Sequence, residues 1–243
     1  MMKNLFLFLL RGGKYHCNIC GSNWLFLNKV GVSSDATKKN KIIGAGIRFT
    51  RCWECGSVER ERLLMNFLDT ITNPTSLRVL HVAPEIQIQK KIQKKFAEYI
   101  TCDLEKKEGI DMAVDITNMK NFSSCEFDIL ICNHVLEHII DDQNAIKEIN
   151  RVLKIRGIAI LNVPIFKDLE KTYFDMSIKD PELRSSHFGQ FDHVRIYGQD
   201  FFKKVERYGF RQKLINYPQL NKKLKLDPDE HVFQFIKQKN III

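Results

Sequence analysis

Four of the seven cysteines form two C-x-x-C pairs, Cys17 with Cys20 and Cys52 with Cys55. A turn of this spacing directs two thiolates at one ion, and a glycine follows each pair, where the turn needs a positive φ. Two such turns predict a closed tetrahedral site for a structural Zn²⁺, whose binding energy would replace the core that this short segment lacks.

Two redox-active pairs and free buried thiols are the alternatives to zinc. A redox pair is expected beside a βαβ pattern, and two copies in one segment would need a separate explanation, so we favour zinc. We interpret Cys102, Cys125 and Cys132 as small core residues, because they lie at apolar strand ends or in a loop. Paired thiols within an odd number of cysteines suit a reducing compartment, so we predict a cytoplasmic location.

A second set of residues follows apolar runs that are typical of β-strands. Ligands of an open parallel sheet bind beyond the carboxyl ends of its strands, so these positions predict a binding site. The residues at these positions are His81, Ala83, Pro84, Glu85, Asp103, Asp115, Ile116, Asn133 and His134.

The spacing between His81 and Asp103 is typical of a carboxylate that accepts hydrogen bonds from both ribose hydroxyls of a nucleoside. A surface acid that caps a helix is the alternative. A dinucleotide needs a glycine-rich turn, and residues 82–87 contain no glycine, so NAD and FAD are not expected. S-adenosylmethionine has no phosphate and tolerates a crowded turn. Asp115 is then placed to meet the adenine amino group.

The elements that must position these residues alternate between strand and helix. An amphipathic pattern that begins near Asp141 and Asp142 predicts a helix that ends before Gly157. Strands are predicted at 78–82, 99–102, 127–132 and 158–163, followed by a helix at 201–207 and strands at 210–216 and 231–236. This alternation predicts an α/β fold with a mostly parallel sheet covered on both faces.

Five sequence blocks, taken in their order along the chain, resemble those of class I S-adenosylmethionine-dependent methyltransferases, in particular the methyltransferase type 11 group. The blocks are RVLHVAPE from Arg78, DLE from Asp103, VDITNM from Val114, FDILICNHVLEHI from Phe127 and RVLKIRGIAILNVP from Arg151. A C-G-S-x-E-R knuckle at 55–60 and a D-H-V-R-x-Y-G block at 192–198 look like those of a bacterial group in this family. The resemblance implies a Rossmann-like sheet with an antiparallel last strand. It also implies a zinc-binding module at 1–62 before a methyltransferase domain at 63–243.

The first block departs from the family pattern. Most class I enzymes have an acid where this chain has His81, and glycines where it has Ala83 and Glu85. We therefore expect Glu85 to take the charge of the methionine ammonium in place of the missing acid.

Residues 134–138 also fit the H-x-x-E-H pattern of zinc metalloproteases. The motif begins directly at the end of a predicted strand, inside the methyltransferase blocks, so a catalytic metal is not expected from it. We interpret His138 as a helix-face residue with a polar partner, and Glu137 as a surface or cofactor-side carboxylate.

The connection at 165–200 is long for a link between a strand and a helix. It is dense in His, Phe, Tyr, Asp and Arg, which disfavours disorder, so we predict a lid over the acceptor pocket. Methyl transfer needs alignment and water exclusion, and a base only for a hydroxyl-like acceptor. His193, oriented by Asp192, is the candidate base, and His187 is the second. A packing role for His193 is the alternative.

Composition narrows the function classes. The chain is 44% hydrophobic and 28% charged, with a formal net charge of +9, which excludes membrane-embedded, collagenous and wholly disordered proteins. Residues 1–10 predict a packed helix or strand rather than a signal peptide, and no transmembrane segment is expected. The lysine pairs are interspersed with acids and indicate solvated faces.

We therefore favour methyl transfer to a small-molecule or saccharide-like acceptor. One alternative is an RNA methyltransferase in which the zinc module and the basic charge hold a nucleic acid. The other is a non-catalytic zinc-ribbon adaptor with a degenerate cofactor site. The sequence leaves the oligomeric state open.

Overall fold

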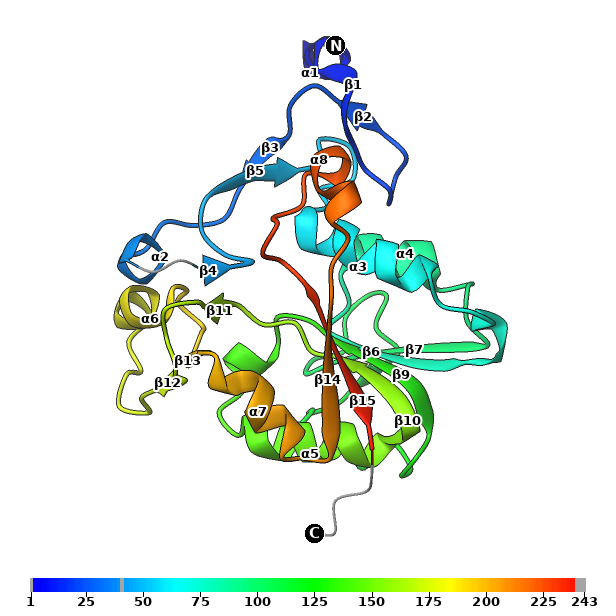
Figure 1. Cartoon of the computed structure of the whole chain (residues 1–243), viewed down its shortest axis with the longest axis vertical. Helices are drawn as coiled ribbons and strands as arrows, with labels where there is room; N and C mark the ends of the chain where they lie inside the picture. Colours follow the sequence, from blue (N-terminus) through cyan, green and yellow to red (C-terminus); the bar gives the residue numbers. More distant parts are fainter. Residues whose placement is uncertain (1, 40–41, 239–243) are drawn as a thin grey trace.

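The structure is a computed structural model that describes residues 2–39 and 42–238. Its centre is a seven-stranded sheet in the order β14-β15-β10-β9-β6-β7-β8 (Figure 1). The strands are β6 (Arg78–Val82), β7 (Glu98–Asp103), β8 (Met112–Ala113), β9 (Phe127–Cys132), β10 (Leu153–Ile160), β14 (Phe210–Ile215) and β15 (Val232–Lys237). Neighbours pair in parallel, except that β15 is antiparallel to β10 and β14. The predicted Rossmann-like sheet is confirmed.

One predicted strand differs at its start. β10 begins at Leu153, which pairs with Phe127, and its register shifts before Ile158 pairs with Ile129. Arg156 adopts a φ of 66° in this bulge, and an ideal Cβ on Gly157 would lie 2.8 Å from the carbonyl oxygen of Lys154. Gly157 therefore permits a tight bulge inside a strand, rather than ending the preceding helix as expected.

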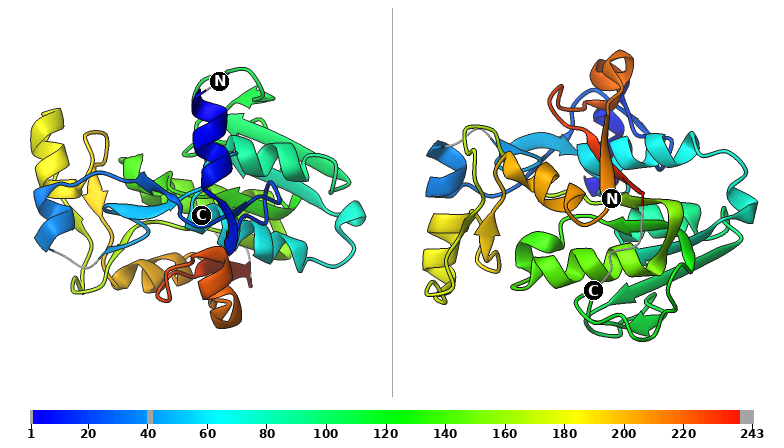
Figure 2. Two further views of the ribbon diagram at one scale, coloured as in Figure 1. Left: turned by 90° about the horizontal axis from the view of Figure 1, so that it is seen from above. Right: turned by 60° about the horizontal axis from the view of Figure 1, so that its bottom comes forward.

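Helices cover both faces of the sheet (Figures 1 and 2). α3 (Glu59–Asp69) and α4 (Ile86–Ile92) pack on the face that presents Ile129. α5 (Asp142–Val152) and α7 (Asp200–Glu206) pack on the opposite face. The Asp141 carboxylate caps α5 by accepting a 3.0 Å hydrogen bond from the amide of Asn144. Burial of both faces explains why the central strands are apolar throughout.

The N-terminal segment consists of short elements joined in small ribbons. They are α1 (Met2–Leu9), β1 (Arg11–His16), β2 (Asn23–Trp24), β3 (Asn28–Val30), α2 (Asp35–Lys39), β4 (Ile42–Ile43) and β5 (Arg48–Arg51). The predicted N-terminal helix forms and packs through one side, since Phe6, Phe8 and Leu9 are 50%, 73% and 66% exposed while the ring of Phe6 contacts that of Trp53. Among residues 6–10 of the described chain, Leu7 and Leu10 are the partly buried side chains that contact the core.

The expected boundary between residues 62 and 63 falls inside α3. The guanidinium of the buried Arg62 donates to the carbonyls of Leu224, Ser57 and Thr50. This side chain joins the cysteine-rich segment to the end of α8 (Asn221–Leu224). The division into 1–62 and 63–243 stays a prediction, since the two parts share a helix.

The connection at 165–200 packs against the N-terminal segment. Its elements are β11 (Ile165–Phe166), β12 (Tyr173–Phe174), α6 (Pro181–Phe188) and β13 (Arg195–Ile196). β11 pairs with β4, and α6 lies beside α2 (left in Figure 1). The remaining elements are η1 (Pro74–Ser76), η2 (Leu136–His138), η3 (Pro218–Leu220) and α8 (Asn221–Leu224). None of the helices in 2–39 and 42–238 has the length and apolar character needed to cross a membrane.

Candidate active site and cysteine cluster

The two cysteine turns have the same backbone geometry. In the first, the amide of Cys17 donates to Ser22 and that of Gly21 to Cys17. In the second, the corresponding bonds run from Cys52 to Ser57 and from Gly56 to Cys52. Both glycines have a φ of 78°, which explains why glycine follows each pair.

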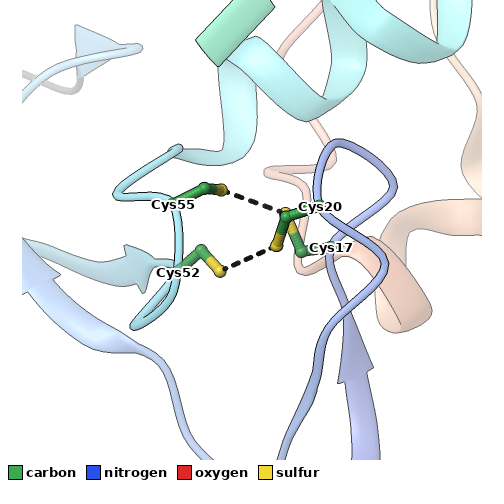
Figure 3. Close-up of side chains that lie close together, drawn as sticks. All are labelled: Cys17, Cys20, Cys52 and Cys55. Atoms are coloured by element: carbon green, nitrogen blue, oxygen red, sulfur yellow. Dashed lines mark hydrogen bonds between the residues drawn. The ribbon is translucent and has the colours of Figure 1, made fainter. Parts of the chain in front are cut away.

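The four cysteine sulfurs converge from the two turns, as predicted (Figure 3). All four lie within 4.8 Å of one another, and the Sγ atoms of Cys17 and Cys55 and those of Cys20 and Cys52 are 3.7 Å apart. Sulfurs on one tetrahedral Zn²⁺ are separated by about 3.8 Å, so the set fits this ion. The hydroxyl of Ser22 contacts two of the sulfurs, as does that of Ser57, which suits donors to thiolates.

The three remaining cysteines lie in different environments. Cys102 and Cys132 are fully buried in the core, as predicted. Cys125 is exposed at a turn where its φ is 56°, so the interpretation of Cys125 as a core residue is wrong.

His81 and Glu85 form a buried pair at the carboxyl end of β6. Nε2 of His81 lies 3.1 Å from Oε2 of Glu85, and Nδ1 lies 2.7 Å from the hydroxyl of Tyr99. Both ring nitrogens of the buried His81 are thus occupied, and one of them contacts the Glu85 carboxylate. Burial raises the pKa of Glu85, but the hydrogen bond and charge of His81 outweigh it and leave the pKa below its ordinary value.

Asn133 follows the last residue of β9 and lies beside Glu85 at the carboxyl edge of the sheet. Its Nδ2 donates to Oε1 of Glu85 at 3.3 Å, while its buried Oδ1 has no hydrogen-bond partner in the described part of the chain. Ala83 stands where most class I enzymes have glycine, and its φ is 45°, the left-handed conformation that glycine adopts readily. Pro84 follows it directly. This turn therefore adopts at an alanine a backbone conformation that glycine adopts readily.

Asp103 and Asp115 lie along the same edge of the sheet. Oδ1 of Asp103 accepts from the amide of Leu104, and Oδ2 is 3.5 Å from Nζ of Lys107. β7 pairs with β8 at Asp103, so the exposed Asp115 follows at the neighbouring strand end. Ile116, next to it, is buried in the core.

A cavity of about 760 Å³ separates the carboxyl edge of the sheet from the N-terminal segment. Its lining combines three parts of the chain that are distant in sequence. The charged and polar residues among its lining are Thr37, Arg48, Arg51, Arg60, Glu61, Gln87, His134, Glu137, His138, Gln190 and His193. Neither Asp103 nor Asp115 lines it, so the cavity is separate from the ribose position expected at the end of β7.

The electrostatics of the cavity centre on Arg60. Its Nε is buried and has no hydrogen-bond partner within the described residues. Burial and the neighbouring charge of Glu85 raise the pKa of Glu61 to about 7, while Arg60 opposes the shift. Burial and Arg60 lower the pKa of His134. Nη1 of Arg60 donates to the carbonyl of Gly44 at 3.4 Å, so the buried Nε is the part of this guanidinium that has no partner in the described chain.

The contacts of the candidate base residues His193, Asp192 and His187 differ from those that the sequence predicts. Nδ1 of His193 donates to the carbonyl of Phe188 at 3.1 Å, whereas the Asp192 carboxylate lies 3.4 Å from Nδ1 of His138. Asp192 therefore orients His138, and the expected pairing of Asp192 with His193 is not found. His187 is exposed, contacts the hydroxyl of Tyr173 and lies outside the cavity lining. Burial, as the largest cause, lowers the pKa of His193.

Comparisons with known proteins give a family match for part of this chain. Residues 85–161 match the family described as "Methyltransferase domain". This chain carries a methyltransferase domain. The YcgJ protein from Bacillus subtilis is 16% identical, with a TM-score of 0.50 over 74% of this chain and 99% of that chain. A candidate methyltransferase from Bacillus halodurans C-125 is 14% identical, with a TM-score of 0.50 over 72% of this chain and 99% of that chain. No curated protein matches this chain significantly.

The methyltransferase domain thus has the fold of the class I, S-adenosylmethionine-dependent enzymes. The sequence pointed to the strand ends and to the lid. It did not single out Arg60, and it indicated a helix-face position for His138 and a surface or cofactor-side position for Glu137. The C-G-S-x-E-R knuckle was a signal for Arg60, because Arg60 is its last residue. The H-x-x-E-H pattern at 134–138 was a local signal for Glu137 and His138, but it could not show that His193 from the distant lid lies beside them.

Proposed function

We propose that this methyltransferase domain uses S-adenosylmethionine to methylate a small-molecule or saccharide-like acceptor held in the cavity. The observation that supports this proposal most directly is made at Asn133. Its buried Oδ1 has no hydrogen-bond partner in the described chain, while its Nδ2 donates to the Glu85 carboxylate. A buried acceptor of this kind costs about 1–3 kcal/mol when unpaired, so it indicates a donor supplied by a ligand. An ammonium group fits a carboxylate and an amide oxygen.

The residues at the strand ends would hold the cofactor. Asp103 would accept from the ribose hydroxyls, and Asp115 from the adenine amino group beside Ile116. Ala83 and Pro84 would let the backbone approach the ligand closely. Glu85, with Asn133 and with His81 behind it, would take the ammonium.

The acceptor side belongs to the cavity. Its volume of about 760 Å³ is in the range of small-molecule sites. S-adenosylmethionine, when bound, supplies an electrophilic methyl group. The lid and the cysteine-rich segment would align the acceptor and exclude water, which provides most of the catalysis that an in-line displacement needs. Glu137, His138 and His193 form the wall that would receive a proton from a hydroxyl acceptor, and the role of His193 as base stays a prediction.

Cys17, Cys20, Cys52 and Cys55 would bind one structural Zn²⁺, an assignment that the sulfur spacing supports. Four thiolates close the site, so this ion would take no part in methyl transfer. Reduced cysteines suit a reducing compartment such as the cytoplasm.

Calorimetric titration with S-adenosylhomocysteine tests the cofactor site. We expect one saturable site per chain, and Asp103→Asn should weaken binding at least about tenfold, because a hydrogen bond to a charged group contributes on the order of 1.5–3 kcal/mol. Asp168→Asn is the matched control, since Asp168 is exposed in the lid. A wild-type protein without saturable binding would favour the adaptor alternative, and equal affinities of the two variants would remove Asp103 from the site.

A further inference from the structure

Three side chains that could bind a metal meet at the wall of the cavity. Glu137 and His138 lie in η2, directly after β9, and His193 reaches them from the lid. One potential ligand atom from each lies within 4.8 Å of the other two. This set differs from the H-x-x-E-H motif, because His134 is not one of the three.

The two imidazoles are held in the form that a metal requires. Nδ1 of His193 contacts the carbonyl of Phe188, and Nδ1 of His138 contacts the carbonyl of Asp192 at 3.3 Å. A carbonyl can only accept, so each Nδ1 carries the proton and each Nε2 keeps a free lone pair. Metal-binding histidines typically donate their other ring nitrogen to a carbonyl or carboxylate in this way.

Glu137 provides the independent observation that points to a ligand. Its side chain is 2% exposed. Its Oε1 is 3.2 Å from Nδ1 of His134, but its buried Oε2 has no partner among the described residues. Burial raises the pKa of Glu137, but the three imidazoles that face it, those of His134, His138 and His193, leave this pKa below its ordinary value. A carboxylate oxygen left unpaired in this setting is costly unless a ligand satisfies it.

We propose that Glu137, His138 and His193 bind one divalent transition-metal cation that faces the cavity. Two imidazoles and one carboxylate suit Zn²⁺, Mn²⁺ or Fe²⁺ better than Mg²⁺ or Ca²⁺, and three protein ligands leave positions open for an acceptor oxygen. The inference rests on the proposed function and narrows its acceptor to a hydroxyl-bearing compound. The lone pair on Nε2 of His193 cannot serve both a cation and a proton, so a bound cation replaces His193 as the free base.

Methyl transfer from S-adenosylmethionine to a hydroxyl acceptor needs no further reactant. A bound cation would lower the pKa of a coordinated acceptor hydroxyl, whose proton would be released to bulk solvent. The acceptor oxygen then forms a bond to the methyl carbon. The carbon–sulfur bond breaks, and its electron pair stays on sulfur, which becomes a neutral thioether.

Electron paramagnetic resonance with Mn²⁺ tests the site in the full chain loaded with one equivalent of Zn²⁺, which the four thiolates bind in preference to the set of two imidazoles and a carboxylate. Mn²⁺ prefers oxygen and nitrogen ligands and leaves thiolate-bound zinc in place. We expect one saturable Mn²⁺ site per chain, and at least about tenfold weaker binding in Glu137→Gln and His193→Asn. His187→Asn is the matched control, because His187 is exposed outside the cavity. If Glu137→Gln does not fold, His193→Asn carries the test.

The inference is overturned if the wild type shows no saturable Mn²⁺ binding, or if His193→Asn binds Mn²⁺ as tightly as the wild type. Calorimetry with S-adenosylhomocysteine, run without Mn²⁺, separates this failure from that of the proposed function. Retained binding of S-adenosylhomocysteine without a Mn²⁺ site overturns the cation alone. Loss of S-adenosylhomocysteine binding with an intact Mn²⁺ site overturns methyl transfer and, with it, the cation's role toward an acceptor.

Discussion

Buried carboxylates gather around Arg60 at the scale of single residues. The charge of Arg60 acts on Glu61, Glu85 and Glu230, three acids that come from separate parts of the chain. One guanidinium cannot neutralise three buried carboxylates, so some of them keep their protons near neutral pH. Arg60 therefore acts as the shared counter-charge of the cavity.

Glu230 gives a prediction about pH. It is 4% exposed, and burial together with the charge of Glu59 raises its pKa to about 8. The unfolded chain releases this proton near pH 4.5, while the folded chain keeps it to about pH 8. The folded state therefore binds more protons between these values, and stability falls as pH rises through the window.

Replacing Glu230 with glutamine removes this titration. Glu230→Gln should exceed the wild type in free energy of unfolding by on the order of 2–4 kcal/mol at pH 8, and the difference should vanish near pH 4. Urea denaturation at several pH values measures it, with Glu182→Gln, an exposed acid on α6, as control. Parallel pH profiles of Glu230→Gln and the wild type would contradict the raised pKa.

At the scale of elements, the lid is built onto the cysteine-rich segment. Ile165 and Phe166 of β11 pair with Ile43 and Ile42 of β4. A small core of Ala36, Phe166, Phe188 and Ile196 lies beneath α2 and α6. β5 leads from this region into the second cysteine turn, and α3 follows that turn. The cysteine cluster is thus continuous with the wall against which the lid packs.

Loss of zinc should therefore loosen the lid as well as the cysteine turns. Removing the metal with a chelator, or replacing Cys52 with serine, should lower the Tm by roughly 10 °C or more, since 1 kcal/mol moves the Tm of a chain of this size by about 2–4 °C. Amide exchange in β4 and β11 should rise with it. Cys125→Ser is the control, because Cys125 is exposed and outside the cluster. An unchanged Tm after zinc removal would refute a structural role for the metal.

For the whole molecule, sequence reasoning predicted the sheet and the two layers of helices. The apolar runs at 78–82 and 127–132 have the same bounds as β6 and β9. These bounds were predictable because buried parallel strands are apolar along their whole length. The cysteine cluster was predictable because its ligand spacing is local. The pairing of β4 with β11 was not, since strands of two residues carry no periodic signal. The bulge in β10 depends on close backbone contact at Gly157, which periodicity does not show.

The central claim is that an adenosyl group binds at the carboxyl ends of β6, β7 and β9. A crystal structure of the protein grown with saturating S-adenosylhomocysteine tests this claim most directly. We predict that the Asp103 carboxylate leaves Lys107 and accepts hydrogen bonds from both ribose hydroxyls, with the amino group of the ligand between Glu85 and Asn133. An adenosyl group bound elsewhere, or crystals in which Asp103 still pairs with Lys107 and no ligand is present, would contradict the account.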